Sequence, residues 1–139
     1  MSKVWASYGA SLLCLLASVL GLLAVAISGP ADGPAVSGEH YFLEAVARGV
    51  EGFGPATVGL LGLAGFIPGA LGRVGSLFIG VCTVALLPLV SGIDMLIRPG
   101  THNLLPLEWA CYLLMAIPAA LGARAGRAFA STVWVPGQQ

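Results

Sequence analysis

The sequence predicts an all-α integral membrane protein, a four-transmembrane-helix up-down bundle with an additional amphipathic helix at the membrane interface. Composition is the first observation behind this fold class, because 58% of the residues are hydrophobic and only 9% are charged. A soluble domain has roughly a quarter charged residues. Mean hydropathy, at +0.94, is the second observation. The third is that the few charged residues are clustered, which leaves long stretches without any.

These stretches define the expected spans. Charged residues are absent from Val4–Ala31, Gly52–Gly72, Val74–Ile93 and Trp109–Ala123. A helix needs about 20 largely apolar residues to cross the hydrocarbon core of a bilayer. We therefore expect one membrane domain over 1–139, with transmembrane helices at 8–28, 54–72, 75–96 and 104–123.

The first span has a second interpretation. Lys3 followed by an apolar run is also the pattern of a cleavable secretory signal. The apolar run is long enough to cross a membrane and the chain begins at Met1, so we expect it to be retained as a true first helix. Gly29 and Pro30 then end this helix.

The segment 39–53 is interrupted by charges and is expected to form an amphipathic helix instead of a span. On a helix His40, Glu44, Arg48 and Glu51 fall within an arc of about 80°. An apolar stripe about 100° wide lies opposite them. The stripe consists of Phe42, Leu43, Val46, Val50 and Phe53. Such a helix lies on the outer membrane surface or packs over the outer ends of the bundle.

Small residues mark a packing face on the second and on the fourth span. The two faces consist of Gly62, Gly65, Gly69 and Gly72, and of Ala116, Ala119, Ala120 and Ala123. In lipid, small residues such as the GxxxG pair Gly65 and Gly69 permit close approach of two helix backbones. We expect these faces to make the tight contacts of the bundle or of a contact with another subunit.

A short phrase occurs twice, as IPGALGR at Ile67–Arg73 and as IPAALGAR at Ile117–Arg124. Both copies stand at the predicted inner end of an even-numbered span, which suggests two tandem helical hairpins of the kind that parallel repeats form. The alternative is that this phrase is suited to ending any membrane helix. In the third span Pro88 predicts a kink, because proline cannot donate a helical hydrogen bond.

Basic residues predict the orientation. We expect both termini to be cytoplasmic, so that the inner side holds Lys3, Arg73 and the tail 124–139 with Arg124 and Arg127. The outer side then holds Arg48 and Arg98. This four-to-two bias follows the positive-inside rule. Trp109 and Tyr112 fit an outer aromatic belt. We expect a location in a bacterial inner membrane.

Polar groups gather on the predicted outer side. This outer polar cluster consists of Glu39, Arg48, Glu51, Asp94, Arg98 and Glu108. His40, Glu44 and His102 form a candidate metal or acid–base group, since His40 and Glu44 are one helical turn apart. The spacing is common and no HExxH signature is present, so an exposed, salt-bridged helix explains the same residues.

Other chemistry has little support in the sequence. Cys14, Cys82 and Cys111 lack CxxC spacing, which favours packing roles. Basic runs that would indicate nucleic-acid binding are absent, as are motifs for a named cofactor. Coupled transporters usually place an ionisable residue deep in the bilayer, and the predicted spans hold none there.

Three functions remain. The first is a non-catalytic structural or assembly subunit that packs against other membrane subunits, motivated by the small-residue faces. A homo-oligomeric channel or small-solute transporter with an acidic outer vestibule is the alternative. The third is a small membrane enzyme or metal-binding protein that uses the outer His/Glu group.

Overall fold

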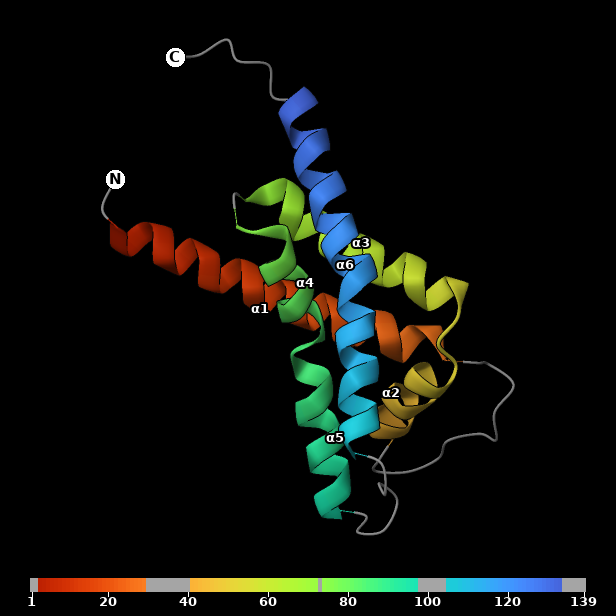
Figure 1. Ribbon diagram of the computed structural model, residues 1–139. Coiled ribbons are helices and arrows are strands. Elements are labelled where there is room, and N and C mark those ends of the chain that lie inside the picture. The colour runs from red at the N-terminus through yellow and green to blue at the C-terminus, as the bar shows by residue number, and fades with distance from the viewer. Residues whose placement is uncertain (1–2, 30–40, 73, 98–104, 134–139) are drawn as a thin grey trace.

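The computed structural model describes residues 3–29, 41–72, 74–97 and 105–133. Within these ranges the chain forms helices and no strand (Figure 1). The helices are α1 (Lys3–Ser28), α2 (Tyr41–Glu51), α3 (Pro55–Leu71), α4 (Ser76–Val84), α5 (Leu86–Ile97) and α6 (Leu105–Val133).

Long apolar helices make this a membrane-embedded protein. Three helical stretches are long and apolar enough to cross a bilayer, namely Tyr8–Ser28, Ser76–Ile97 and Glu108–Val133. Their large side chains remain exposed in the isolated chain, as Leu96 at 84% and Leu77 at 78% show. Water would make this exposure costly, whereas hydrocarbon accepts it.

The second expected span, 54–72, is shorter and bent. α3 has 17 residues, and only together with Ala45–Glu51 of α2, across a bend of 112°, does it count as a further candidate span. Its start is well defined, because Pro55 occupies the first helical position and the Gly54 N–H donates to Thr57 Oγ1 at 3.4 Å.

The third expected span, 75–96, consists of two helices that meet at Ala85. Pro88 lacks the N–H that would bond to the Val84 carbonyl, and its ring crowds that carbonyl. The Ala85 N–H instead donates to the Cys82 carbonyl at 3.1 Å, a tighter turn than that of an α-helix. The kink expected at Pro88 therefore appears as a break one turn earlier.

α6 continues beyond the expected end of the fourth span. The sequence placed this end at Ala123 and assigned 124–139 to a tail, yet α6 runs to Val133 as one helix. Residues 123–130 are rich in alanine and arginine, which favour helix, and the next proline is Pro136. Residues 134–139 lie outside the described part of the chain.

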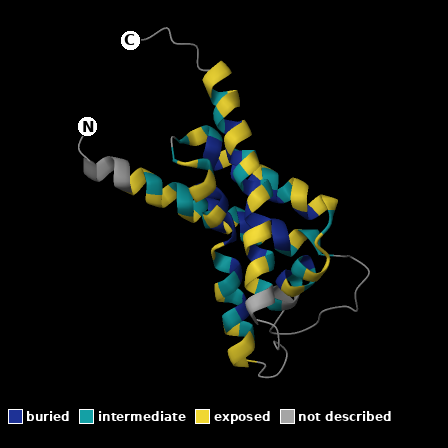
Figure 2. Ribbon diagram, viewed as in Figure 1, coloured by how far each residue is buried: buried dark blue, intermediate teal, exposed yellow. Residues whose placement is uncertain are grey.

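The helices are arranged in two antiparallel pairs. α1 and α3 run side by side and cross the others steeply in the view of Figure 1, while α4 and α5 follow α6 along its length. The most deeply buried side chains, dark blue in Figure 2, include Val25, Leu61, Ile79, Leu87 and Met115. The fold is therefore all-helical in the described part of the chain. It has three helical stretches that can span a membrane, and a fourth span if the bent pair of α2 and α3 counts as one.

α2 packs against the C-terminal end of α1. A Cβ at Gly49 would overlap the Val25 carbonyl, so glycine is what permits this approach. On the expected apolar stripe Val46 is buried, Leu43 and Val50 are half-buried, and Phe53 is exposed. The side chain of Phe42 lies outside the described part.

α3 and α6 make the closest backbone contact where they cross, and residue numbers increase together along both helices through this contact. A Cβ at Gly65 would overlap the Ala119 carbonyl, and one at Gly69 the Ala123 carbonyl. From the other side, Gly122 lies against the Gly62 carbonyl. Backbones therefore touch without intervening side chains over about two turns of each helix.

The remaining small residues meet other helices. Ala116 and Ala120 face Gly80 of α4, where an added Cβ would lie 2.7 Å from the Ala116 carbonyl oxygen. Gly72, the last residue of the predicted glycine face, lies against Leu13 of α1. Both faces are thus used for contacts inside this one chain.

The two copies of the repeated phrase touch where Gly69 meets Ala123, but equivalent positions do not face each other. Gly65 meets Ala119 and Gly62 meets Gly122, so the offsets are 54 and 60, whereas the two copies of the phrase are offset by 50. α3 and α6 are thus shifted along each other by roughly one to three turns relative to a two-fold arrangement of equivalent hairpins.

Candidate functional site

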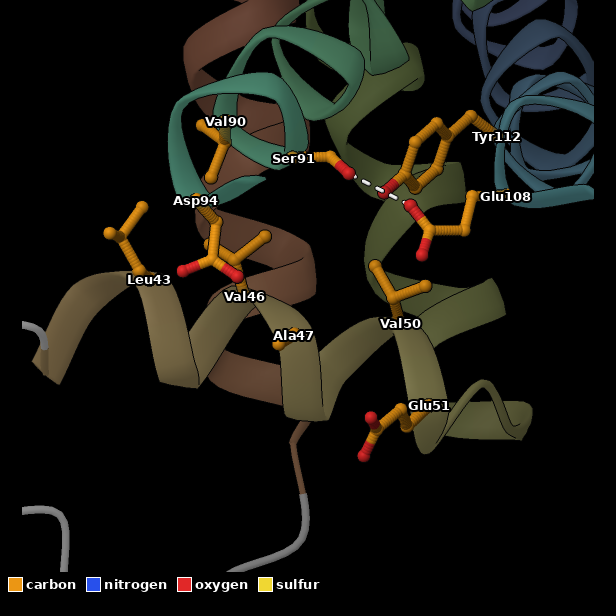
Figure 3. Close-up of a pocket in the computed structure, with 10 residues that line it drawn as sticks. All are labelled: Leu43, Val46, Ala47, Val50, Glu51, Val90, Ser91, Asp94, Glu108 and Tyr112. Atoms are coloured by element: carbon orange, nitrogen blue, oxygen red, sulfur yellow. Dashed lines mark hydrogen bonds between the residues drawn. The ribbon is translucent and has the colours of Figure 1, made fainter. Parts of the chain in front are cut away.

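A cavity of about 160 Å³ lies between α2, α5 and α6 (Figure 3). Its apolar wall consists of Leu43, Val46, Ala47, Val50 and Val90. Its polar residues are Glu51, Ser91, Asp94, Glu108 and Tyr112. The cavity combines an apolar surface with three carboxyl groups and two hydroxyls, and none of the described residues that line it is basic.

Helical spacing places these groups on one side of each helix. Ser91 and Asp94 are three residues apart on α5, and Glu108 and Tyr112 are four apart on α6, so each pair shares a face. α2 supplies Leu43, Val46, Ala47 and Val50, which recur with the period of its apolar stripe. The antiparallel packing of α5 and α6 then brings the two polar faces together.

A hydrogen bond joins the two faces. The Ser91 hydroxyl donates to Glu108 Oε2 at 2.8 Å, and the Tyr112 hydroxyl points toward this pair in Figure 3. Ser91 and Tyr112 are each only 6% exposed. Because the donor is buried and fixed on its helix, it holds one carboxyl oxygen of Glu108 in place. The other carboxyl oxygen points toward α2 in Figure 3.

The other two carboxyl groups occupy different depths. Asp94 extends from α5 toward α2 and ends near Leu43 and Val46 in Figure 3. Glu51, at the end of α2, is exposed and forms part of the rim. Asp94 and Glu108 are therefore the acidic groups that a bound molecule would meet inside the cavity.

The structure locates part of the predicted outer polar cluster. Glu51, Asp94 and Glu108 meet at the cavity, while Arg48 is half-buried on α2 and does not line it. Glu39 and Arg98 lie outside the described residues.

The candidate metal group falls outside what the structure describes. His40 and His102 lie in undescribed segments, and of Glu44 only the backbone is described. Across the described ranges there is no group of three or more His, Cys, Asp or Glu residues that could hold a metal ion.

Sequence reasoning missed two residues of the cavity. The sequence did not single out Ser91, and it predicted Tyr112 in an aromatic belt together with Trp109. In the structure Tyr112 is buried, whereas Trp109 is 56% exposed. The i, i+4 spacing of Glu108 and Tyr112 was the available signal for Tyr112. Nothing in the sequence indicated that Ser91 would meet Glu108, because their contact depends on how α5 and α6 pack.

Two cysteines that are far apart in the sequence also meet. The Ser18 hydroxyl lies 2.6 Å from the Cys82 carbonyl oxygen on α4 and 2.9 Å from the Cys14 carbonyl oxygen on its own helix. The side chains of Cys14 and Cys82 are close enough to interact. Both cysteines are free, as is Cys111.

No family model, curated protein or solved structure matches this chain. Its function is therefore argued from the cavity and the surrounding surface.

Proposed function

We propose that this protein binds a small organic cation in the cavity between α2, α5 and α6 and serves as a small-solute carrier or channel with an acidic entrance. The cavity is the observation that supports this proposal. Asp94 and Glu108 supply carboxyl oxygens, which favour a cation, and the wall of Leu43, Val46 and Val50 favours an apolar group attached to it.

The volume limits the size of the ligand. A protein cavity of about 150 Å³ holds benzene, so a cavity of about 160 Å³ suits an amine with roughly six non-hydrogen atoms. In such a complex the ammonium group pairs with Glu108, which Ser91 holds in place, and the hydrocarbon part lies against α2.

The competing role of assembly subunit was motivated by the small-residue faces. In the structure Gly62, Gly65 and Gly69 pack on α6 of the same chain, and Ala116 and Ala120 pack on Gly80. These faces are consequently occupied, and they supply no surface for a second protein. This favours the solute-binding function.

Neutralising Glu108 tests the proposal. Binding of cyclopentylammonium to the purified protein is measured by calorimetry in detergent. E108Q is expected to bind it about tenfold to a hundredfold more weakly, because a hydrogen bond to a charged group is worth about 1.5–3 kcal/mol. Glutamine still accepts the Ser91 hydrogen bond, so the cavity keeps its shape. Wild-type protein that does not bind any small organic cation would refute the proposal.

A matched pair of variants separates occupancy of the cavity from general damage to the fold. V90F places a ring into the cavity and should abolish binding, whereas L89F adds the same ring at an exposed neighbouring position of α5 and should leave binding intact. Binding that is as strong in V90F as in L89F would show that the cavity is not the binding site.

The membrane arrangement that we propose has four spans with both termini cytoplasmic. The C-terminal end of α1, α2, the end of α5 and the start of α6 gather around the cavity, and α3 leads from there to the turn before α4. The cavity then opens toward the outer side of the membrane, and the location proposed for the protein is a bacterial inner membrane.

An accessory subunit is the second candidate, and one exposed feature favours it. Ala56 and Gly59 lie on the exposed side of α3, and nothing lies within 4 Å of a Cβ added at Gly59. A helix of another subunit, or of a second copy, can approach α3 closely at these two small residues. Co-purification of a stoichiometric foreign subunit from native membranes, lost in a G59L variant, would favour this function over solute binding.

A further inference from the structure

A second hollow lies at the other end of α6, between the N-terminal end of α4 and the last third of α6. It has a volume of about 520 Å³ and is lined by Ser76, Arg124, Arg127, Ala128 and Ser131. Arg124 is 16 residues from Glu108 along α6, which separates this hollow from the acidic cavity by about 24 Å. Whereas the cavity is lined by carboxyl groups, this hollow is lined by two guanidinium groups and two hydroxyls.

The positive charge of this hollow has no carboxylate near it in the sequence. Acidic residues are absent from 52–93 and from 109–139. Glu51, Asp94 and Glu108, three acids that the structure describes, line the cavity at the opposite end. In the described part of the chain, therefore, no acidic side chain neutralises Arg124 and Arg127 at this end.

The start of α4 adds donors to the hollow. Gly75 precedes this helix and offers no side-chain cap, and the first turn contains no acidic residue. The first N–H groups of a helix have no partner within it and carry the positive end of the helix dipole. Ser76, the first residue of α4, lines the hollow, so this helix start lies beside it.

Arg127 is held next to this helix start. Its Nη2 donates to the Val74 carbonyl, in the turn before α4. Its Nε is buried and has no hydrogen-bond partner among the described residues. Arg124, one turn earlier on α6, is exposed and can move toward a ligand.

We infer that this hollow binds a phosphate group. A tetrahedral oxyanion accepts several hydrogen bonds at once and matches both the guanidinium fork and the N–H groups of a helix start. The phosphate belongs either to the headgroup of an anionic lipid, which the cytoplasmic leaflet carries, or to free inorganic phosphate. This inference is independent of the solute-binding cavity.

The test measures retained ligands by native mass spectrometry of the purified full-length protein. Phosphatidic acid, oleate and inorganic phosphate are added separately, because oleate has the same kind of tail and a negative charge but no phosphate. The wild type is expected to retain one phosphatidic acid or one phosphate, and to bind oleate at least tenfold more weakly. Retention of phosphatidic acid alone identifies a lipid headgroup, and retention of inorganic phosphate identifies a soluble source.

R124Q is the informative variant, because Arg124 is exposed and its loss leaves the Arg127–Val74 contact in place. It should weaken retention about tenfold, the effect of removing one charge-assisted hydrogen bond. K3Q removes one positive charge elsewhere in the sequence and should leave retention unchanged. Equal retention of oleate and phosphatidic acid, or equal effects of R124Q and K3Q, would overturn the inference.

Discussion

Single glycines determine how closely the helices of this protein approach. At Gly65 the α6 backbone occupies the space that a side chain would need, since a Cβ there would overlap the Ala119 carbonyl. The obstacle is backbone, which cannot rotate away as a flexible side chain can. Even the smallest substitution should therefore push α3 and α6 apart.

G65A is expected to destabilise the protein by about 1–3 kcal/mol, the usual cost of overpacking a tight contact. Gly59 provides the control on the same helix, because nothing lies within 4 Å of its added Cβ. G59A should be neutral or stabilising by up to about 1 kcal/mol, because alanine is the better helix former. Thermal unfolding of both variants in detergent measures the difference, and equal unfolding temperatures would contradict the α3–α6 contact.

Among the helices, α1 and α4 are joined by groups that the sequence did not connect. Ser18 reaches the Cys82 carbonyl, and a Cβ at Gly21 would overlap the Thr83 carbonyl, so the two helices touch at one crossing point. The thiols of Cys14 and Cys82 meet at the same place. These two free cysteines are therefore the pair that we expect to form a disulfide on oxidation.

Mild oxidation with iodine should consequently join Cys14 to Cys82 within one chain. The product is recognised by its faster migration on a non-reducing gel and by the loss of two thiols to maleimide labelling. C111S should still cross-link, whereas C14S should not. Cross-linking that persists in C14S, or its absence in the wild type, would contradict the observed packing of α1 on α4.

For the whole molecule, the question is how many times the chain crosses the membrane. In the proposed four-span arrangement, α3 carries the chain from the acidic cavity to the basic hollow, so that Phe53 and Ser131 lie on opposite sides. If α2 and α3 instead form a re-entrant pair, the chain crosses three times, and these two positions fall on the same side.

Single cysteines distinguish the two arrangements. In a variant lacking Cys14, Cys82 and Cys111, F53C should react with an impermeant maleimide from the outside of intact cells, and S131C only after the cells are opened. Both positions are exposed in the structure. Labelling of both from the same side would exclude the four-span arrangement.

The sequence predicted the helices well because their determinants are local. Runs without charge identified 8–28 and 54–72 within about one residue of the end of α1 and of both ends of α3. The prediction from sequence was less accurate for the end of α6. The span was expected to end at Ala123, but the alanine and arginine residues that follow favour helix, and α6 continues to Val133. The amphipathic pattern likewise placed α2, although the pattern did not indicate which helix it would cover.

Contacts between helices were decided only by the tertiary structure. Composition and charge spacing established by themselves a membrane-embedded helical protein whose few charged residues are clustered between long apolar stretches. The cavity arises because α5 and α6 pack with Ser91 opposite Glu108 and because α2 closes over them. A periodic pattern specifies which face of a helix is buried, but several partners can satisfy the same face, so the choice among them depends on the packing of the whole chain.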